Sequence, residues 1–485
     1  MKFNFKIIGS LLGILLVING GFMLLCIPVS MVYQEGGTLP LIISAGISVS
    51  IGSLLWAVSR NRTDNNLNKR DGYLIVTLGW LSMSLVGTLP FLVSGAIPNF
   101  TNAFFETLSG FTTTGASILD DIESIPKGIL FWRSLTQWMG GMGIIVLAVA
   151  ILPILGIGGM QLFVAEAPGL KPDKLQPRIT ATARRLWIIY VGLTGLEFVL
   201  LWIGGMTVFD ALNHSLTTMA TGGFSTKQLS VAYYDSPYIQ YVIIFFMFLA
   251  GTNFTLTYFG FKGNFKKVWA NEEFRVYSIG TLSLGILVCI GLYYNGESNI
   301  EQSFRDALFQ VVSVITTTGF VSADYTLWGP AMSVFFFMLM FLGASAGSTS
   351  GGVKIVRHLL LIKNGVLELK RQIHPTAIIP VRLNNKAVSQ EITFNVLAFI
   401  MIYLTIYVVS TIIMGLIGVD FVTALGSVAT SLGNIGPGFG TVGPVHNFAH
   451  IPSIGKWFLS FLMLLGRLEL FTVLILITPY FWRRS

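Results

Sequence analysis

Charged side chains are scarce in this chain of 485 residues, where Asp, Glu, Lys and Arg together make up 11%. A soluble globular protein carries about 25% of these residues, and hydrophobic residues here reach 53%. The composition therefore excludes an ordinary soluble protein and predicts a polytopic membrane protein. The net charge of +8 would also suit a nucleic-acid partner. However, the basic residues lie in short loops between apolar runs, so membrane topology explains them better, and we expect no nucleic-acid binding.

Cysteine and histidine are also sparse. The two cysteines, Cys26 and Cys289, lie inside apolar runs, which excludes a disulfide framework and favours packing in the core. The five histidines are scattered without a metal-ligand spacing such as HExxH. His446 and His450 are four residues apart, but in a loop rich in Gly and Pro. A membrane-embedded hydrolase or transferase, the alternative from another class, therefore lacks converging chemical groups, and we expect no enzyme activity and no cofactor in this chain.

Long polar loops are missing as well. The longest loop expected on the basic side of the membrane covers residues 363–390, which is too short to fold as a domain. A nucleotide-binding or sensing domain would therefore have to belong to another chain.

Apolar runs of about 20 residues, the length that crosses a membrane, occur ten times. The first begins with basic residues like a signal peptide, but it is longer than a signal core and has no A-x-A cleavage site. We therefore expect it to remain as a membrane helix. The predicted spans are 7–32, 39–59, 73–95, 129–153, 184–206, 238–261, 275–294, 331–362, 391–417 and 455–481.

A shorter feature recurs between these spans. Residues 306–320 read DALFQVVSVITTTGF, an apolar stretch that ends in threonines and Gly319. Ala307 lies twelve residues before Gly319, and this Ala-to-Gly spacing is held four times, which marks an internal repeat. The other copies are 102–116 with Ala103 and Gly115, 210–224 with Ala211 and Gly223, and 423–437 with Ala424 and Gly436.

The residue types in these copies indicate a cation path. Twelve helical residues reach about 18 Å, roughly half of the ~30 Å hydrocarbon core, so each short helix can enter the membrane but not cross it. The irregular backbone that follows is tolerated only inside protein or along a water-filled path. Four glycine turns around one axis would present a ring of carbonyl oxygens that replaces the hydration shell of a cation. Ordinary loops with small residues are the alternative.

The repeats predict the domain organisation and fold class. We expect an all-α polytopic membrane protein with four pseudo-repeated units of helix, pore helix, filter and helix around a central ion pore. Two extra transmembrane helices precede them. The predicted divisions are 1–60 for the N-terminal helix pair, followed by repeats at 73–153, 184–262, 275–362 and 391–482.

Basic residues favour one side of the predicted topology. Most Lys and Arg residues fall in loops that share a side with both termini. The positive-inside rule makes this side cytoplasmic, so both termini are expected in the cytoplasm. The other side has more acids, among them Glu106, Asp210 and Asp306, which predicts an acidic outer mouth that concentrates cations. Solvated loops are the alternative, and for Asp210 and Asp306 so is helix capping.

Ten small residues interrupt the eighth span. Residues 343–352 read GASAGSTSGG, and each glycine in a helix interior is about 1 kcal/mol less favourable than alanine. We therefore expect an unwound loop that crosses beneath the glycine turns and obstructs the path. A close helix-packing seam is the alternative, although a seam needs small residues on one face only.

A charged residue, Arg467, lies near the middle of the tenth span. A central arginine costs about 2.5–3.5 kcal/mol on insertion scales, so it must face protein or water. Glu469 projects roughly 200° away on the same helix, so the two are not expected to pair. We expect a fixed positive charge beside the path, and a buried ion pair is the alternative. The segment 133–147, RSLTQWMGGMGIIVL, predicts a tight packing junction with an interfacial Trp138.

Taken together, these segments resemble the membrane subunit of the Trk/Ktr/HKT superfamily of potassium transporters, most closely its bacterial Trk type. The resemblance covers nearly the whole chain, and the two extra N-terminal spans favour the Trk type over the shorter Ktr type. The matching segments are TTTGAS, ATGGFST, TTTGF, GNIGPGFG, RSLTQWMGGMGI, GASAGSTSGGVK and GRLELFTVL.

The resemblance implies K⁺ uptake across the bacterial cytoplasmic (inner) membrane through a pseudo-fourfold pore. It also implies a homodimer and a separate cytoplasmic ring of regulatory subunits that bind a nucleotide, NAD or ATP/ADP. In the plant branch, serine at the first filter position accompanies Na⁺ transport. The residue here is Gly115, so K⁺ is expected, with a Na⁺ or ammonium transporter of the same architecture as the alternative.

The resemblance also implies roles for individual residues. The K⁺ ligands are expected at Thr114, Gly222, Thr318 and Ile435, and the fourth turn departs from the others at Asn434 and Pro437. The implied filter residues are Thr113, Thr114, Gly115, Thr221, Gly222, Gly223, Thr317, Thr318, Gly319, Asn434, Ile435 and Gly436. The implied gating residues are Gly343, Gly347, Ser348, Gly351, Gly352 and Arg467.

Overall fold

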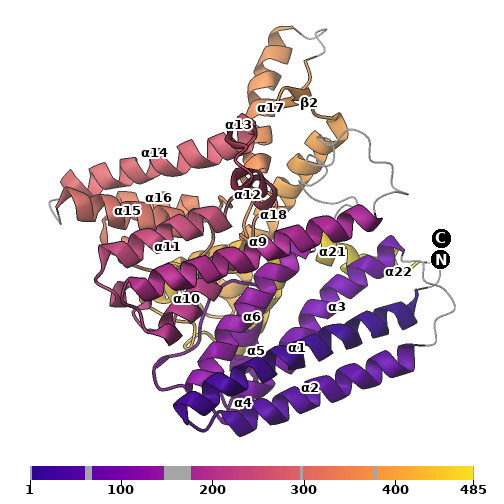
Figure 1. The fold of residues 1–485 in the computed structure, drawn as a ribbon. Coiled ribbons are helices and arrows are strands. Elements are labelled where there is room, and N and C mark those ends of the chain that lie inside the picture. Colours follow the sequence, from indigo (N-terminus) through magenta and orange to yellow (C-terminus); the bar gives the residue numbers. More distant parts are fainter. Residues whose placement is uncertain (1–2, 61–67, 147–175, 295–298, 375–378, 484–485) are drawn as a thin grey trace.

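The computed structural model describes residues 3–60, 68–146, 176–294, 299–374 and 379–483. This part of the chain is predominantly helical, and its strands form one small hairpin. The predicted all-α class is therefore confirmed. Figure 1 shows long helices lying side by side, with α17 and the hairpin projecting beyond them. The hairpin consists of β1 (Arg382–Leu383) and β2 (Lys386–Ala387), and α17 covers Ile355–Ile373.

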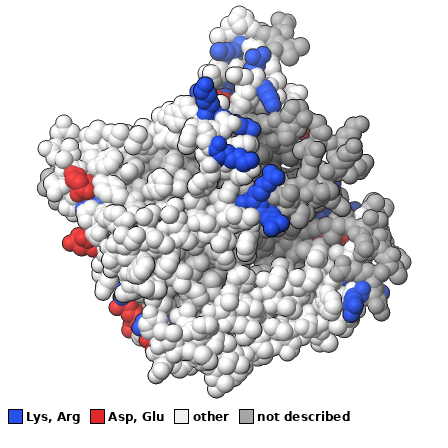
Figure 2. Space-filling model, viewed as in Figure 1, with Lys and Arg blue, Asp and Glu red and all other residues white. Residues whose placement is uncertain are grey.

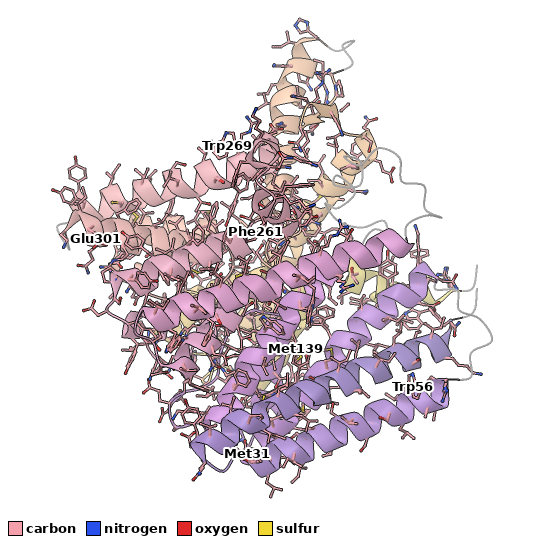
Figure 3. The ribbon with its side chains drawn as sticks, in the orientation of Figure 1. Met31, Trp56, Met139, Phe261, Trp269 and Glu301 are labelled. Carbon is pink, nitrogen blue, oxygen red and sulfur yellow. The ribbon has the colours of Figure 1, made fainter. Side chains whose placement is uncertain are left out.

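Six membrane-length helices are found among the described residues. Figure 3 labels Met31 and Trp56, which are exposed on the outside of the bundle, and Met139, which is buried inside it. Apolar side chains that face outward from long apolar helices suit contact with lipid tails. The six spans are α1 (Phe5–Tyr33), α2 (Thr38–Ser59), α3 (Lys69–Gly87) continued by α4 (Leu89–Ser94), α9 (Gln176–Ile203), α14 (Glu272–Tyr294) and α18 (Gln390–Leu416).

The first two helices pack through facing glycines. A Cβ added at Gly13 would lie 2.6 Å from the Gly52 carbonyl oxygen, and one added at Gly52 would lie 2.7 Å from the Gly13 oxygen. Both distances are shorter than van der Waals contact, so neither position has room for a side chain. Small residues let the two backbones approach closely, which is how helices associate in a lipid environment.

Replacing Gly13 with leucine should therefore destabilise the protein by about 1–3 kcal/mol, the usual cost of overpacking. The measurement is the thermal midpoint of the purified protein in detergent. Gly21→Leu is the matched control on the same helix, because nothing lies within 4 Å of a Cβ at Gly21. Equal midpoints for the two variants would contradict close glycine packing.

Charges are distributed unevenly over the surface. Figure 2 shows Lys and Arg gathered around α13 (Phe265–Ala270) and α17, whereas Asp and Glu lie along the opposite edge. Figure 3 places Glu301 at that acidic edge. The chain ends lie together, because the ring of Phe3 contacts the rings of Phe481 and Trp482. The basic and acidic ends of the bundle therefore differ as the sequence predicts.

Four short helices stand between the spans, and a side chain caps the start of each. The capping residues are Asn99, Thr207, Asn299 and Asp420, which accept backbone N–H groups of the first turn. The capping role considered for Asp306 is therefore wrong, because this residue lies inside its helix. Asp210 is not the capping residue either, but it lies in the first turn, three residues after Thr207. The short helices are α5 (Phe100–Phe111), α10 (Val208–Met219), α15 (Ile300–Ile315) and α19 (Phe421–Gly433).

Two predicted spans are not continuous helices. The sixth bends by 111° between α11 (Pro237–Ala250) and α12 (Phe254–Phe261), and the tenth bends by 120° between α20 (Ser453–Arg467) and α21 (Phe471–Ile477). Their sequences stay apolar through the breaks, so hydropathy alone missed them. Tertiary contacts produce the first break, because Asn253 caps α12 and also donates to the Ala346 carbonyl 2.6 Å away.

The eighth span is interrupted where the small residues predicted it. It runs as α16 (Pro330–Leu339), then a non-helical segment that includes 343–352, then α17. The fourth span appears as α6 (Lys127–Val146), and its predicted end at 147–153 lies outside the described residues. The remaining short elements are η3 (Ser230–Tyr233), η4 (Tyr325–Leu327), η5 (Gly440–Val442) and α22 (Pro479–Trp482).

Candidate functional site

The four glycine turns share one backbone conformation. In each turn the glycine has a positive φ, and so does the residue two positions before it. A non-glycine residue in this left-handed region is strained, and such strain gathers at functional sites. The pairs of φ angles are 51° and 80° at Thr113 and Gly115, 53° and 75° at Thr221 and Gly223, 57° and 77° at Thr317 and Gly319, and 54° and 104° at Asn434 and Gly436.

The turns also lie against one another in a closed cycle. A Cβ added at any of the first three glycines would collide with a carbonyl oxygen of the next turn in the chain. At Gly436 it would lie 2.9 Å from the Thr114 oxygen, which belongs to the first turn. Every oxygen in this cycle belongs to the residue immediately before a turn glycine. The facing pairs are Gly115 with Gly222, Gly223 with Thr318, Gly319 with Ile435, and Gly436 with Thr114.

Each short helix ends where its turn begins, so its partially negative C-terminus lies at the ring. The first and third turns use the same internal bond, since 2.8 Å separates the hydroxyls of Thr112 and Thr114, as it does those of Thr316 and Thr318. The fourth turn differs because Asn434 replaces threonine. Its side-chain amide donates to the Thr114 hydroxyl at 2.9 Å, which joins the last turn to the first.

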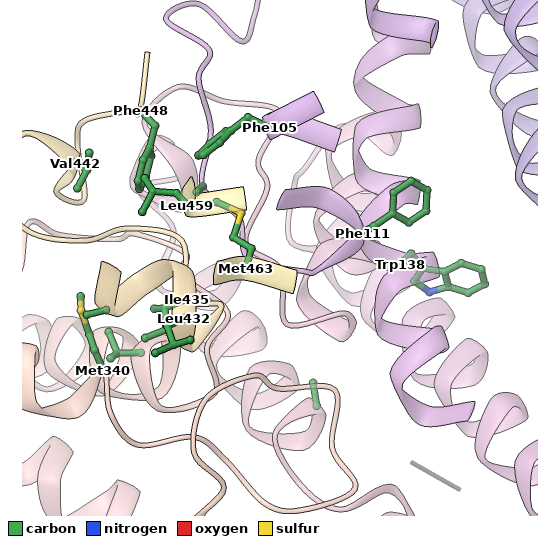
Figure 4. Close-up of a cluster of buried hydrophobic side chains, with 14 of the residues drawn as sticks. Phe105, Phe111, Trp138, Met340, Leu432, Ile435, Val442, Phe448, Leu459 and Met463 are labelled. Carbon is green, nitrogen blue, oxygen red and sulfur yellow. The ribbon is translucent and has the colours of Figure 1, made fainter. Parts of the chain in front are cut away.

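The apolar surroundings hold the fourth turn in place. Ile435 is fully buried, and its side chain lies in a cluster with Leu432 and Met340 (Figure 4). Met463 and Leu459 from α20 complete the packing on the other side of this cluster. The Ile435 side chain is therefore committed to the core, and only its backbone faces the next turn.

A cavity of about 80 Å³ lies against the ring and is lined by all four turn glycines. Its volume is enough for a few water molecules. Arg133, Lys227 and His446 also line it, whereas no Asp or Glu belongs to the described lining. Of the acids predicted for the outer mouth, Glu106 is buried and paired with Arg133, so it does not present a free charge to this cavity. The acidic outer mouth as a whole stays a prediction.

Glu106 and Arg133 form a buried ion pair, with 2.7 Å between Oε1 and Nε. Their side chains are 0% and 3% exposed. Glu106 also accepts the Ile118 N–H at 2.9 Å, and Arg133 donates to the Ser225 carbonyl at 3.0 Å. The pair therefore ties the segment after the first turn to the segment after the second. The sequence analysis expected Glu106 on the outer side of the membrane and did not pair it with Arg133.

The predicted packing junction in 133–147 is present, because a Cβ at Gly140 would collide with the Phe111 carbonyl oxygen. Trp138, expected at the membrane interface, is instead buried. It stacks on Tyr190 at 5.4 Å and donates to the Thr194 hydroxyl at 3.1 Å.

Gln137, beside it, reaches the second turn, where its Nε2 donates to the Gly222 carbonyl at 2.6 Å.

The segment 343–352 is hydrogen-bonded to the end of one of the four short helices and to one glycine turn. Thr349 donates from its hydroxyl to the Met219 carbonyl at 3.0 Å, at the end of α10. Gly351 donates its N–H to the Thr317 hydroxyl at 2.7 Å. Gly347 and Gly352 have φ of +75° and +65°, so glycine suits both positions. Gly343 and Ser348 also belong to this compact loop, where they bond to Val353 and Ser345.

Arg467 joins this loop to α6. Its two terminal nitrogens donate to the Thr349 carbonyl at 2.8 Å and to the Gly140 carbonyl at 3.2 Å. Arg467 lies at the C-terminal end of α20 and not in the middle of a continuous span, as the sequence predicted. The helix break explains the difference, and the negative end of α20 favours the cation.

Glu469 pairs with Arg357 of α17 and not with Arg467. The predicted lack of a pair with Arg467 holds, but its reason differs, because α20 ends at Arg467 and Glu469 lies beyond that helix. Lys354, at the start of α17, donates to the carbonyl and hydroxyl of Ser350. The sequence analysis identified neither Arg357 nor Lys354 as part of the site. Their place after the small-residue segment is the only signal that could have found them.

The arrangement suits binding of a bare monovalent cation by carbonyl oxygens. The described residues contain no group of three or more His, Cys, Asp or Glu that could hold a metal ion. Carbonyl rings replace a hydration shell without fixed carboxylates, so the lack of acids at the ring agrees with that chemistry.

Comparison with known proteins gives matches over the full chain. The family described as TrkH, cation transport protein, matches residues 41–276 and 268–483. The chain is 44% identical to the Trk system potassium uptake protein TrkH of Salmonella typhimurium, over 99% of this chain and 100% of that protein. It is 33% identical to TrkG of Escherichia coli K12, over 99% of both. The crystal structure of the potassium transporter TrkH from Vibrio parahaemolyticus aligns with a TM-score of 0.91 and 38% identity, over 100% of both chains.

Proposed function

This chain belongs to the TrkH family of cation transport proteins, and on that premise we propose that it takes up K⁺ across the bacterial inner membrane. Its relatives are named as potassium uptake proteins of the Trk system. Such names favour ion transport over enzyme activity.

The closed cycle of four turns is the observation that carries this proposal. The carbonyl oxygens of Thr114, Gly222, Thr318 and Ile435 occupy equivalent places in it, and we assign them as K⁺ ligands. The three-residue segments 113–115, 221–223, 317–319 and 434–436 form the selectivity filter. The negative ends of four short helices add to the attraction for a cation.

The loop at 343–352 is the gate in this proposal. It is bonded to the end of α10 and to the third turn, on the side of the turns away from the glycine-lined cavity. Arg467 holds it through the Thr349 carbonyl. Opening would require these bonds to break and the loop to move aside.

Assembly and orientation follow the Trk system. We place both termini and the basic end of the bundle in the cytoplasm and expect the chain to work as a homodimer. A separate cytoplasmic ring of subunits that bind NAD or ATP/ADP would act on the gate from that end.

Gly115→Ser tests the filter. The new Cβ would collide with the Gly222 carbonyl oxygen, and the positive φ of 80° would be strained. We expect the K⁺ over Na⁺ permeability ratio to fall by about tenfold or more. The displaced carbonyl would bind K⁺ less well, and the lost free energy should be at least that of one hydrogen bond. Reversal potentials in mixed K⁺ and Na⁺ measure it in liposomes.

Gly95→Ser is the matched control, because Gly95 also has a positive φ, of 75°, but nothing lies within 4 Å of its Cβ. An unchanged ratio in folded Gly115→Ser protein would remove the glycine from the filter. If the wild-type protein prefers Na⁺ or ammonium over K⁺, that ion and not K⁺ is its substrate.

A further inference from the structure

One side chain that does not belong to the four glycine turns donates a hydrogen bond to their ring of carbonyl oxygens. Gln137 lies within α6 and is fully buried. Its Nε2 donates to the Gly222 carbonyl at 2.6 Å, and its Oε1 accepts the Phe224 N–H at 3.0 Å. The amide therefore spans Gly223 and fixes the residues on both sides of that turn glycine.

Gln137 also lies at the joint between two turns. A Cβ at Gly115 would lie 3.8 Å from the Gln137 Nε2, and a Cβ at Gly222 would collide with the whole amide. The Gly222 oxygen itself faces Gly115 of the first turn. Gln137 thus contacts the oxygen of the second turn that faces the first turn.

The other three oxygens of the ring have no such partner. Among the described residues, we find no side-chain or backbone N–H donated to the carbonyls of Thr114, Thr318 or Ile435. A carbonyl oxygen has two lone pairs, so the Gly222 oxygen keeps one for a cation while the other is occupied. The ring is therefore chemically unequal, with three free oxygens and one that carries a donor.

We propose that Gln137 is a specificity-determining residue that positions the Gly222 carbonyl and weakens its attraction for small cations. This inference rests on the proposed function. A hydrogen bond withdraws electron density from the oxygen, and a weaker field disfavours Na⁺, whose dehydration is the more costly. The amide also prevents the Gly222 oxygen from moving inward to surround a smaller ion. Both effects favour K⁺, so loss of the amide should lower selectivity.

Gln137→Met tests the proposal, because methionine keeps the length and removes both hydrogen bonds. We expect the K⁺ over Na⁺ permeability ratio to fall by about tenfold, the factor associated with loss of the one hydrogen bond that reaches a ring oxygen, at Gly222. Gln310→Met is the matched control. Gln310 is 1% exposed and belongs to the third short helix, but it donates to the Ser322 hydroxyl and not to the ring. Its variant should keep the wild-type ratio.

The ratio separates specificity from a purely structural role, since misfolding lowers K⁺ and Na⁺ flux together. Gln137→Asn provides a second variant in which the shortened amide cannot reach both partners, and its ratio should fall as well. A wild-type ratio in either folded variant would overturn the inference. So would failure of both variants to fold while Gln310→Met folds, because Gln137 would then be structural. A wild-type protein that does not discriminate K⁺ from Na⁺ would instead overturn the proposed function.

Discussion

Replacing Arg467 with alanine should raise K⁺ flux through the folded protein by up to about a hundredfold. Two effects act in the same direction. The variant loses the bond to the Thr349 carbonyl that holds the 343–352 loop. It also loses a positive charge near the proposed K⁺ path. A charge about 6 Å from K⁺ would repel it by roughly 3 kcal/mol with an effective dielectric constant near 20.

Rubidium uptake into liposomes that contain equal amounts of folded protein measures this effect. Arg467→Lys should change flux less, because the charge remains although the paired donors are lost. Arg305→Ala is a matched control, since Arg305 is also largely buried but pairs with Glu301 at the acidic edge; its flux should stay near wild type. A well-folded Arg467→Ala protein with unchanged or lower flux would refute the gate.

Replacing Glu106 with glutamine should destabilise the protein by about 3–5 kcal/mol, the usual effect of breaking one half of a buried ion pair. The Arg133 side chain is 3% exposed, so the variant leaves a buried positive charge without its charged partner. The thermal midpoint of the purified protein in detergent measures the loss. The double variant Glu106→Gln with Arg133→Gln should recover part of it, because no isolated charge remains.

Glu35→Gln serves as the comparison. Glu35 pairs with Lys127 at 3.0 Å, but their side chains are 36% and 38% exposed. An exposed pair contributes about 0–1 kcal/mol, so this variant should shift the midpoint little. Similar shifts for Glu106→Gln and Glu35→Gln would show that burial does not determine how much the Glu106–Arg133 pair contributes to stability.

The sequence was sufficient for features that a short stretch encodes. The repeated Ala-to-Gly spacing located all four turns, because a glycine with positive φ must follow each short helix at the same place. The run at 343–352 located the interruption of the eighth span, since four glycines in ten residues do not support a helix. Both signals depend only on neighbours in the chain.

Features that depend on distant partners could not be predicted. The bend after Ala250 arises because Asn253 bonds to Ala346, 93 residues away, within an otherwise apolar run. Glu106 and Gln137 were visible as residues, but their partners Arg133 and Gly222 are separated from them by 27 and 85 positions. No local pattern in the sequence specifies such pairings, so these two contacts of the site could be identified only in the three-dimensional structure.

The joint between Asn434 and Thr114 connects residues 320 positions apart. A ribosome delivers the first turn early and the fourth near the end, so the cycle stays open during most of synthesis. A chain cut short before Asn434 holds three turns and no enclosed row of oxygens. Completion of the polypeptide is therefore a condition for the proposed filter, because prematurely terminated chains would lack the fourth member of the ring of carbonyl oxygens.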